Sequence, residues 1–266
     1  MCGFVGGNKL QSKDELSLCL NKIIHRGKDY TGVFQNGEVF LGHNRLSIQD
    51  TSENANQPFV SNSGDTVIVY SGELWEGYQE LKSQLLPEYK FRTNSDTEVI
   101  LALYEKYGVE SFKKLDGMFS FVIYDKRQEI LLLVRDRIGK IPFYYFSDSN
   151  SKIIFSNEMK AFSQFSDIRD KSYLVMNVTP GTYIHYDLKT RKFHHEIHYS
   201  LPYSQEYAGE YDLKDSPEII ATNIREKLEI AVKKRFISDV PICVLLSGGI
   251  DSVVTTYLAK KFIPNI

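Results

Sequence analysis

The residue whose position suggests chemistry most directly is Cys2, in the opening run Met1-Cys2-Gly3-Phe4-Val5-Gly6-Gly7. If Met1 is removed, the thiol of Cys2 and a free α-amine share one residue. A terminal amine titrates at roughly 7.7 to 8.0, so near neutral pH it can accept the proton of the thiol and generate a nucleophile. An isolated cysteine at a chain end is more often an ordinary residue in a frayed terminus. The rest of the chain must decide between these two interpretations.

A second pattern with chemical potential is Ser247-Gly248-Gly249-Ile250-Asp251-Ser252. It follows the continuous apolar run 241–246, which we predict to be a strand buried on both faces of a parallel sheet. It precedes 253–260, which we predict to be a helix. Strand, glycine turn and helix together gather backbone N–H groups around phosphate oxygens. A Gly-Gly pair taken alone is commonly just a turn.

Composition limits the class of protein. The chain has 266 residues, of which 42% are hydrophobic and 25% charged, as in an ordinary globular protein of one large or two smaller domains. A net charge of -2 argues against broad attraction to nucleic acid or to anionic membranes. Cys2, Cys19 and Cys243 have no paired spacing, so neither a disulfide framework nor a zinc site is indicated. With no leader-like start and no apolar run that could span a bilayer, we predict a cytoplasmic protein.

The predicted elements indicate an α+β fold through about residue 200. The predicted strands are 2–7, 32–34, 39–41, 66–71, 118–124, 129–134, 143–146, 153–156 and 181–187. Helices are predicted at 15–24, where Cys19 belongs to the apolar face, and at 98–107, after the cap-type residues 93–96. Asn36-Gly37 predicts a tight hairpin. Residues 201–215 lack periodicity and are predicted to be a linker, and a further helix is predicted at 217–236.

Several short motifs then occur in one order along nearly the whole chain. They are Cys-Gly-Phe-Val-Gly at the start, His-Arg-Gly at 25–27, His-x-Arg-Leu-Ser-Ile at 43–48, Gly-Glu at 72–73, Ser-Asp-Thr-Glu at 95–98, Arg-Asp-Arg-x-Gly at 135–139 and Leu-Leu-Ser-Gly-Gly-Ile-Asp-Ser at 245–252. In this order they resemble the glutamine-hydrolysing asparagine synthetases. The resemblance implies a four-layer αββα glutaminase domain of the amino-terminal-nucleophile, class II amidotransferase type at 2–200. A linker at 201–216 and the incomplete start of an ATP-pyrophosphatase-type α/β adenylating domain at 217–266 would follow.

The same resemblance implies roles for individual residues of the first domain. Cys2 would attack the side-chain amide of glutamine and form a γ-glutamyl thioester, with its α-amine as the base. Arg45 would grip the α-carboxylate of glutamine, and Ile48 lies in the same substrate-binding motif. Glu73 and Asp96 would bind the ammonium and amide groups. The alternative for the charged residues is a surface ion pair or, for Asp96 before a predicted helix, a cap.

The sequence departs from the family at Ser71. The family has Asn-Gly-Glu where this chain has Ser71-Gly72-Glu73, and the asparagine side chain and glycine N–H form the oxyanion hole there. A serine hydroxyl is shorter, and loss of one oxyanion donor typically slows catalysis about 100- to 1000-fold. Two hypotheses follow from this difference. Either the domain is an active glutaminase, or it is a hydrolysis-impaired module that binds glutamine or serves as a scaffold.

For the second domain the resemblance implies ATP and Mg²⁺ as cofactors. Pyrophosphate would be bound by Ser247, Gly248, Gly249, Asp251 and Ser252, with Asp251 also near the magnesium ion. One strand and one helix cannot make a doubly wound sheet, so we expect residues after about 216 to be poorly ordered or aggregation-prone alone. Ammonia would then pass to aspartate, or to another carboxylate such as a sugar acid, on a missing domain or a separate synthetase chain. A homodimer is also possible under this resemblance.

Overall fold

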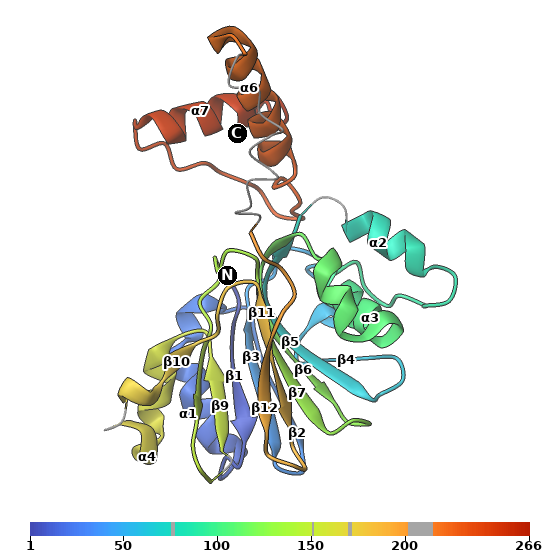
Figure 1. Cartoon of the computed structure of the whole chain (residues 1–266), viewed down its shortest axis with the longest axis vertical. Coiled ribbons are helices and arrows are strands. Elements are labelled where there is room, and N and C mark those ends of the chain that lie inside the picture. Colours follow the sequence, from blue (N-terminus) through green and yellow to red (C-terminus); the bar gives the residue numbers. More distant parts are fainter. Residues whose placement is uncertain (76–77, 151, 170–171, 202–214) are drawn as a thin grey trace. The chain divides into compact units, whose positions relative to one another are not determined.

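The computed structural model describes residues 1–75, 78–150, 152–169, 172–201 and 215–266 (Figure 1). The chain divides into two compact units, Met1–Ser200 and Leu201–Ile266. The predicted linker falls almost entirely on residues 202–214, which lie outside the described residues.

The first sheet of unit one carries the amino-terminal segment in its interior. Its strands, in the order β10-β8-β9-β1-β3-β2, are β10 (Met176–Asn177), β8 (Tyr144–Ser147), β9 (Ile153–Ser156), β1 (Gly3–Asn8), β3 (Val39–Arg45) and β2 (Tyr30–Asn36). β1 pairs antiparallel with β3 and with β9. Cys2 therefore directly precedes a strand that is hydrogen-bonded on both sides, and this pairing orders a segment that would otherwise fray. The predicted hairpin at Asn36-Gly37 joins β2 to β3 and is confirmed.

The second sheet carries the predicted site residues Ser71, Gly72 and Glu73 near the end of one strand. Its strands, in the order β12-β11-β7-β6-β5-β4, are β12 (Phe193–Ile197), β11 (Thr182–Asp187), β7 (Ile130–Arg135), β6 (Gly117–Asp125), β5 (Thr66–Leu74) and β4 (Phe59–Val60). β5 pairs with β6 along its whole length, from Thr66 opposite Asp125 to Leu74 opposite Gly117. Residues 71–73 lie near the carboxyl end of this long strand, so their backbone is fixed by the sheet.

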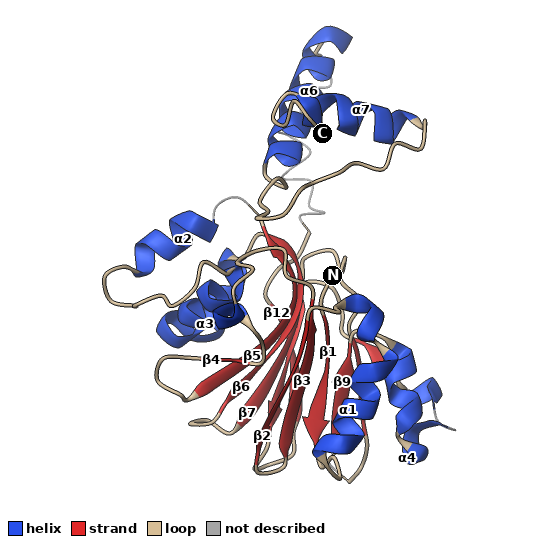
Figure 2. Ribbon diagram, turned by 180° about the vertical axis from the view of Figure 1, so that it is seen from behind, coloured by secondary structure: helices blue, strands red, loops and turns tan. Residues whose placement is uncertain are grey.

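Helices cover the outer faces of the two sheets, which gives the predicted four-layer αββα arrangement (Figure 2). The helices of unit one are α1 (Lys13–Lys22), α2 (Tyr78–Leu85), α3 (Asp96–Tyr107), α4 (Ser166–Arg169) and the 3₁₀ segments Ile24–Arg26, Glu53–Ala55, Gly108–Lys114, Met159–Gln164 and Ser172–Leu174. Side chains alternate along β1, so that Phe4 joins the cluster between the sheets and Val5 joins the cluster under α1. Cys19 is fully buried in that second cluster, which confirms its assignment to the core.

In the described part of unit two, residues 215–266 form two helices, α6 (Pro217–Lys233) and α7 (Ile250–Lys260). They pack on each other through an ion pair between Lys261 and Glu229 and a contact between the rings of Phe236 and Phe262. The prediction of a strand at 241–246 is wrong, because the structure has no strand there. A parallel strand needs neighbours that accept and donate its backbone hydrogen bonds, and residues 215–266 provide no other strand. Of the helices in the described ranges, none is long and apolar enough to cross a membrane.

Truncation of Phe4 tests how far the order of the amino-terminal strand depends on the core between the sheets. Phe4 is fully buried, and its ring lies 5.2 Å from that of Phe143. Phe4→Ala should lower the free energy of unfolding by about 3–5 kcal/mol, because it leaves a cavity in a packed core. The measurement is urea denaturation followed by the fluorescence of Trp75, the single tryptophan, which reports on unit one. Leu18→Ala, at a side chain on α1 that is 54% exposed, is the control and should change little.

Candidate active site

Cys2 lines a pocket built from the chain terminus, the segment after β3, the end of β5 and the start of α3. The residues around it are Met1, Cys2, Arg45, Leu46, Ile48, Gln49, Ala55, Gln57, Tyr70, Gly72, Glu73, Ser95, Asp96 and Thr97. The residues predicted from the motifs that meet here are Cys2, Arg45, Ile48, Gly72, Glu73 and Asp96. Ser71 is the one predicted residue of this unit that does not line the pocket. Residues far apart in the sequence thus form a single site.

Asp96 is held rigidly at the first position of α3. Its Oδ2 accepts hydrogen bonds from the hydroxyl of Tyr70 at 2.8 Å and from the backbone N–H of Leu74 at 2.9 Å. The helix cap is Ser95, whose hydroxyl accepts from the N–H of Thr97, so the cap role suggested as an alternative for Asp96 belongs to its neighbour. Burial raises the pKa of Asp96, although these hydrogen bonds oppose the shift. The carboxyl group is positioned before any ligand arrives.

Glu73 places a second carboxyl group in the same pocket. Its pKa is raised by burial and further by the nearby negative charge of Asp96. Buried carboxyl groups whose pKa values are raised in this way are stabilised in their charged forms by a bound cation. The pair therefore fits a ligand that carries a positive charge, such as the ammonium group of an amino acid.

Arg45 ends β3 and organises the segment that follows it. Its Nη1 donates to the carbonyl oxygen of Ser52 at 2.7 Å and to Oδ1 of Asn56 at 2.8 Å. Its Nη2 donates to the carbonyl oxygens of Gln49 and Asp50. The guanidinium group is buried, which lowers the pKa of Arg45, while the nearby Cys2 and Asp50 raise it. Arg45 lines the pocket, yet both its Nη atoms already bind the segment 49–56.

The thiol of Cys2 lies against the backbone of Leu46. Sγ accepts from the Leu46 N–H at 3.3 Å and lies 3.5 Å from the Leu46 carbonyl oxygen, to which the thiol can donate. Burial raises the pKa of the thiol, and the Leu46 N–H, the terminal amine and Arg45 oppose that shift. A buried thiol of this kind needs a base to become a nucleophile. In the chain as it stands Met1 precedes Cys2 and itself lines the pocket.

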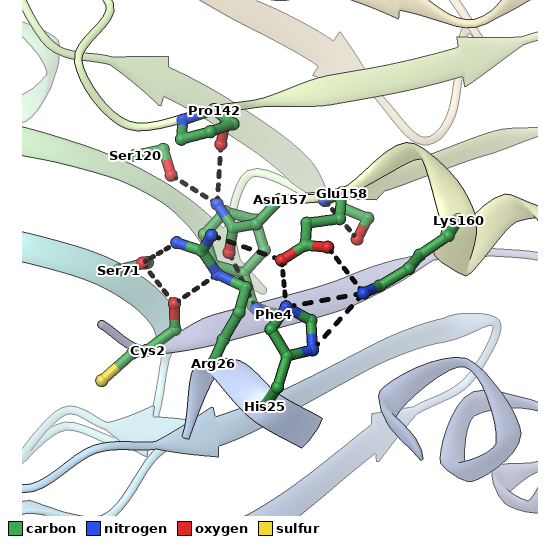
Figure 3. A network of polar contacts seen from close by, with 11 residues as sticks. Cys2, Phe4, His25, Arg26, Ser71, Ser120, Pro142, Asn157, Glu158 and Lys160 are labelled. Carbon is green, nitrogen blue, oxygen red and sulfur yellow. Dashed lines mark hydrogen bonds and ion pairs between the residues drawn. The ribbon is translucent and has the colours of Figure 1, made fainter. Parts of the chain in front are cut away.

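The carbonyl oxygen of Cys2 is clamped on the side away from the thiol (Figure 3). It accepts from the hydroxyl of Ser71 at 2.7 Å and from Nε of Arg26 at 2.9 Å. Arg26 in turn approaches Glu158 at 3.5 Å, and Glu158 also bonds Nε2 of His25 at 2.7 Å. Arg26 belongs to the His-Arg-Gly motif, so the sequence contained a signal for it, whereas Glu158 had none. These residues fix the backbone that carries the thiol.

The position of Ser71 differs from the role that the family resemblance implies. Ser71 is fully buried, and its hydroxyl is committed to the Cys2 carbonyl rather than to the pocket. The neighbouring Gly72 does line the pocket, with φ of 153°. A Cβ atom at Gly72 would lie 2.2 Å from the carbonyl oxygen of Met118, so only glycine allows this close approach to β6. Ser71 therefore anchors the backbone of Cys2.

Asn157 anchors β1 at Phe4, two residues after Cys2. Its Oδ1 accepts from the N–H of Phe4 at 2.9 Å, and its Nδ2 donates to Oγ of Ser120 and to the Pro142 carbonyl oxygen, both at 2.8 Å (Figure 3). The three hydrogen bonds that fix the backbone of Cys2 and Phe4 are made with the side chains of Ser71, Arg26 and Asn157, which are distant in the sequence. The nucleophile segment is consequently attached to both sheets.

The second motif forms a turn at the start of α7. Gly248 has φ of 85° and Gly249 precedes the helix, while the hydroxyls of Ser247 and Ser252 bond each other at 3.0 Å. Asp251 lies in the first turn of α7. Within the described ranges no group of three His, Cys, Asp or Glu side chains could hold a metal ion. Because magnesium usually takes only one or two carboxylates plus phosphate oxygens, Asp251 fits as one part of such a site, and its role stays a prediction.

Comparison with known proteins assigns the family. Residues 1–205 match the family model described as a glutamine amidotransferase domain. The chain belongs to the class II glutamine amidotransferases. Residues 223–266 match the asparagine synthase family, so a short start of that domain follows the amidotransferase domain. Only a fragment of the ATP-using domain is thus present in the sequence.

The relatives of this amidotransferase have two kinds of name. An amidase of Gibberella zeae is 38% identical over 264 residues, covering 93% of this chain and 39% of its own. Asparagine synthetase B (glutamine-hydrolyzing) of Escherichia coli is 33% identical over 239 residues, covering 90% of this chain and 40% of its own. A probable asparagine synthetase of Dictyostelium discoideum is 34% identical and covers 98% and 46%, respectively. The chain therefore spans about two fifths of the length of these relatives.

Solved structures confirm the fold. A glutamine phosphoribosylpyrophosphate amidotransferase of B. subtilis, solved with ADP and GMP, superposes with a TM-score of 0.61. The match covers 98% of this chain and 64% of that one at 19% sequence identity. At this identity the likeness establishes the amino-terminal-nucleophile amidotransferase fold, with two antiparallel sheets and flanking helices.

Glu158→Gln tests whether the clamp on the Cys2 carbonyl matters for the chemistry. Loss of the charge that faces Arg26 should loosen the Cys2 backbone, and small misplacements of a reacting group cost up to about 100-fold in rate. We expect kcat for glutamine hydrolysis to fall about tenfold or more, with KM nearly unchanged. Lys160→Gln is the control, since Lys160 contacts Glu158 and the ring of His25 rather than Arg26, and its loss should have a smaller effect. A Glu158→Gln protein with wild-type kcat would contradict the role of the clamp.

His43 makes the stability of the amidotransferase domain depend on pH. The ring is fully buried, its Nε2 bonds the Tyr70 carbonyl oxygen at 2.9 Å, and burial lowers the pKa of His43 from 6.5 to about 3. Below pH 6.5 the unfolded chain binds a proton that the folded chain does not. The contribution of His43 to the free energy of unfolding is therefore fully present above pH 6.5. It is lost as the pH drops toward 3, by at most about 1.4 kcal/mol per pH unit.

Urea denaturation at several pH values between about 7 and about 5 measures this dependence. His43→Asn should reduce the slope, while His198, whose pKa is also lowered by burial, remains in both proteins. An identical slope in the two proteins would show that His43 is not the group responsible.

Proposed function

We propose that unit one hydrolyses L-glutamine to glutamate and ammonia. The observation that supports this most strongly is the shared pocket. Cys2 lines it together with two carboxyl groups, Glu73 and the hydrogen-bonded Asp96, and the guanidinium group of Arg45. Opposite charges in one small site suit a zwitterionic amino acid, with its ammonium on the carboxylates and its carboxylate on the arginine.

In the proposed reaction the α-amine of Cys2, freed by removal of Met1, takes the proton of the thiol. The thiolate adds to the side-chain carbonyl carbon of glutamine and pushes the carbonyl electrons onto oxygen. The tetrahedral intermediate collapses to a γ-glutamyl thioester, and the protonated amine returns its proton to the leaving ammonia. Water then attacks the thioester, which releases glutamate and regenerates the thiol. The Gly72 backbone is the proposed oxyanion contact, and the commitment of Ser71 to the Cys2 carbonyl predicts slow turnover.

We propose further that the ammonia amidates aspartate, in an ATP-dependent step on a synthetase domain of which residues 223–266 are the start. In that domain Ser247, Gly248, Gly249, Asp251 and Ser252 would contact the phosphates, with magnesium beside Asp251. The names of the relatives support both asparagine synthesis and other amidations, so another carboxylate is the second candidate acceptor. The chain's own residues assign no acceptor site.

The position of Ser71 favours one further candidate function. If the missing oxyanion donor disables hydrolysis, the pocket still binds glutamine, and unit one acts as a glutamine-binding or scaffolding module. Under this hypothesis unit one binds glutamine but releases no ammonia from it.

A glutaminase assay separates the two hypotheses. Ammonia release is measured for the natural chain, for Ser71→Asn and for Cys2→Ala, after mass spectrometry has confirmed the loss of Met1. We expect slow, Cys2-dependent release by the natural chain and faster release by Ser71→Asn, by up to about 100-fold. Ser71→Ala is the matched control, because it removes the bond to the Cys2 carbonyl without supplying an amide donor. Ammonia from Ser71→Asn but none from the natural chain would sink the glutaminase proposal in favour of the binding module.

A further inference from the structure

Gln49 is a polar residue in the pocket that has no part in the proposed hydrolysis of glutamine. It lines the pocket together with Cys2 and Arg45. Both polar atoms of its side chain, Nε2 and Oε1, are buried and have no hydrogen-bond partner among the residues that the structure describes. Leaving buried amide groups unpaired destabilises a folded protein, so their presence calls for a partner that the free chain does not contain.

Gln57 provides a direct contrast in the same pocket. Its Nε2 donates to the hydroxyl of Thr97 at 3.3 Å, and its Oε1 accepts from the backbone N–H of Tyr70 at 2.6 Å. The fold therefore satisfies one pocket glutamine through its own groups and leaves the other unsatisfied. Gln57 supports the structure, whereas the amide of Gln49 is available to a ligand.

The position of Gln49 indicates which part of a ligand it meets. The Gln49 carbonyl oxygen accepts from Nη2 of Arg45 at 3.4 Å, so the residue is tied to the pocket's one arginine. Both Nη atoms of Arg45 are already shared among acceptors in the segment 49–56. A carboxylate that binds at Arg45 therefore gains from an additional donor nearby, and the Nε2 of Gln49 is such a donor.

We propose that Gln49 is a specificity-determining residue whose side-chain Nε2 hydrogen-bonds the α-carboxylate of the substrate amino acid. This inference rests on the proposed function in that it takes glutamine as the ligand. A second hydrogen bond to a carboxylate, added to the contact with Arg45, selects substrates that carry a free α-carboxylate over simple amides.

Binding of L-glutamine to the full chain carrying Cys2→Ala tests the proposal by isothermal titration, because this background binds without turnover. Gln49→Met keeps the length of the side chain and removes its polar atoms. We expect the Kd for L-glutamine to rise about tenfold or more. Without ligand, the melting temperature of Gln49→Met should equal or exceed that of the parent, because no protein hydrogen bond is lost. Gln57→Met is the matched control and should melt lower, since it unpairs the buried N–H of Tyr70.

Gln49→Glu tests the charge of the substrate group that the side chain at position 49 meets. A glutamate at 49 would repel an adjacent α-carboxylate, so binding should become weaker than in Gln49→Met. Binding stronger than in the parent would show that the side chain meets the ammonium group instead, and would overturn the proposal. An unchanged Kd in Gln49→Met would overturn it as well.

Measuring both ammonia release and L-glutamine binding separates the role of Gln49 from the proposed hydrolysis. If the parent binds L-glutamine and Gln49→Met binds it weakly, the inference stands even when the chain with Cys2 releases no ammonia. If ammonia is released and Gln49→Met binds normally, the glutaminase stands and the inference falls. No binding of L-glutamine by the parent would overturn both.

Discussion

The clamp on the Cys2 carbonyl oxygen is the interaction on which the rest of the site depends. A nucleophile at a chain end must be ordered, although chain ends usually fray. Here Ser71 and Arg26 hold the carbonyl, and the next residues form a strand that is paired on both sides. The backbone is fixed through an atom that takes no part in the chemistry. Cys2 itself lines the pocket.

Electrostatic pairing explains the composition of the pocket around that thiol. Burial raises the pKa of both Glu73 and Asp96, and the charge of Asp96 raises that of Glu73 further. Hydrogen bonds from Tyr70 and Leu74 fix Asp96 in place. Such a site is preorganised for a ligand with a cationic group, since the geometry is complete before binding. Burying these groups destabilises the free chain, and a bound cationic group would offset that loss.

Much of the fold followed from local patterns. The hairpin at Asn36-Gly37, the strand that carries 71–73 and the helix that begins near Asp96 all depend on turn chemistry or periodicity within a few residues. Features that depend on residues distant in the sequence could not be predicted from such local patterns. The direction of the Ser71 hydroxyl is set by Cys2 and Arg26, and nothing near Ser71 in the sequence indicates it. The run 241–246 has the composition of a buried strand, but a strand also needs neighbours.

The location of Met1 has a consequence for how this protein comes into being. Met1 lines the pocket, and while it is attached the nitrogen of Cys2 is an amide, which cannot act as a base. Under the proposed reaction, a chain that keeps Met1 is therefore a masked precursor, and removal of this single residue would both empty part of the pocket and create the basic group. A tag fused ahead of Cys2 would preserve that precursor state. The proposed reaction thus requires a free amino end at Cys2, with fusions placed elsewhere.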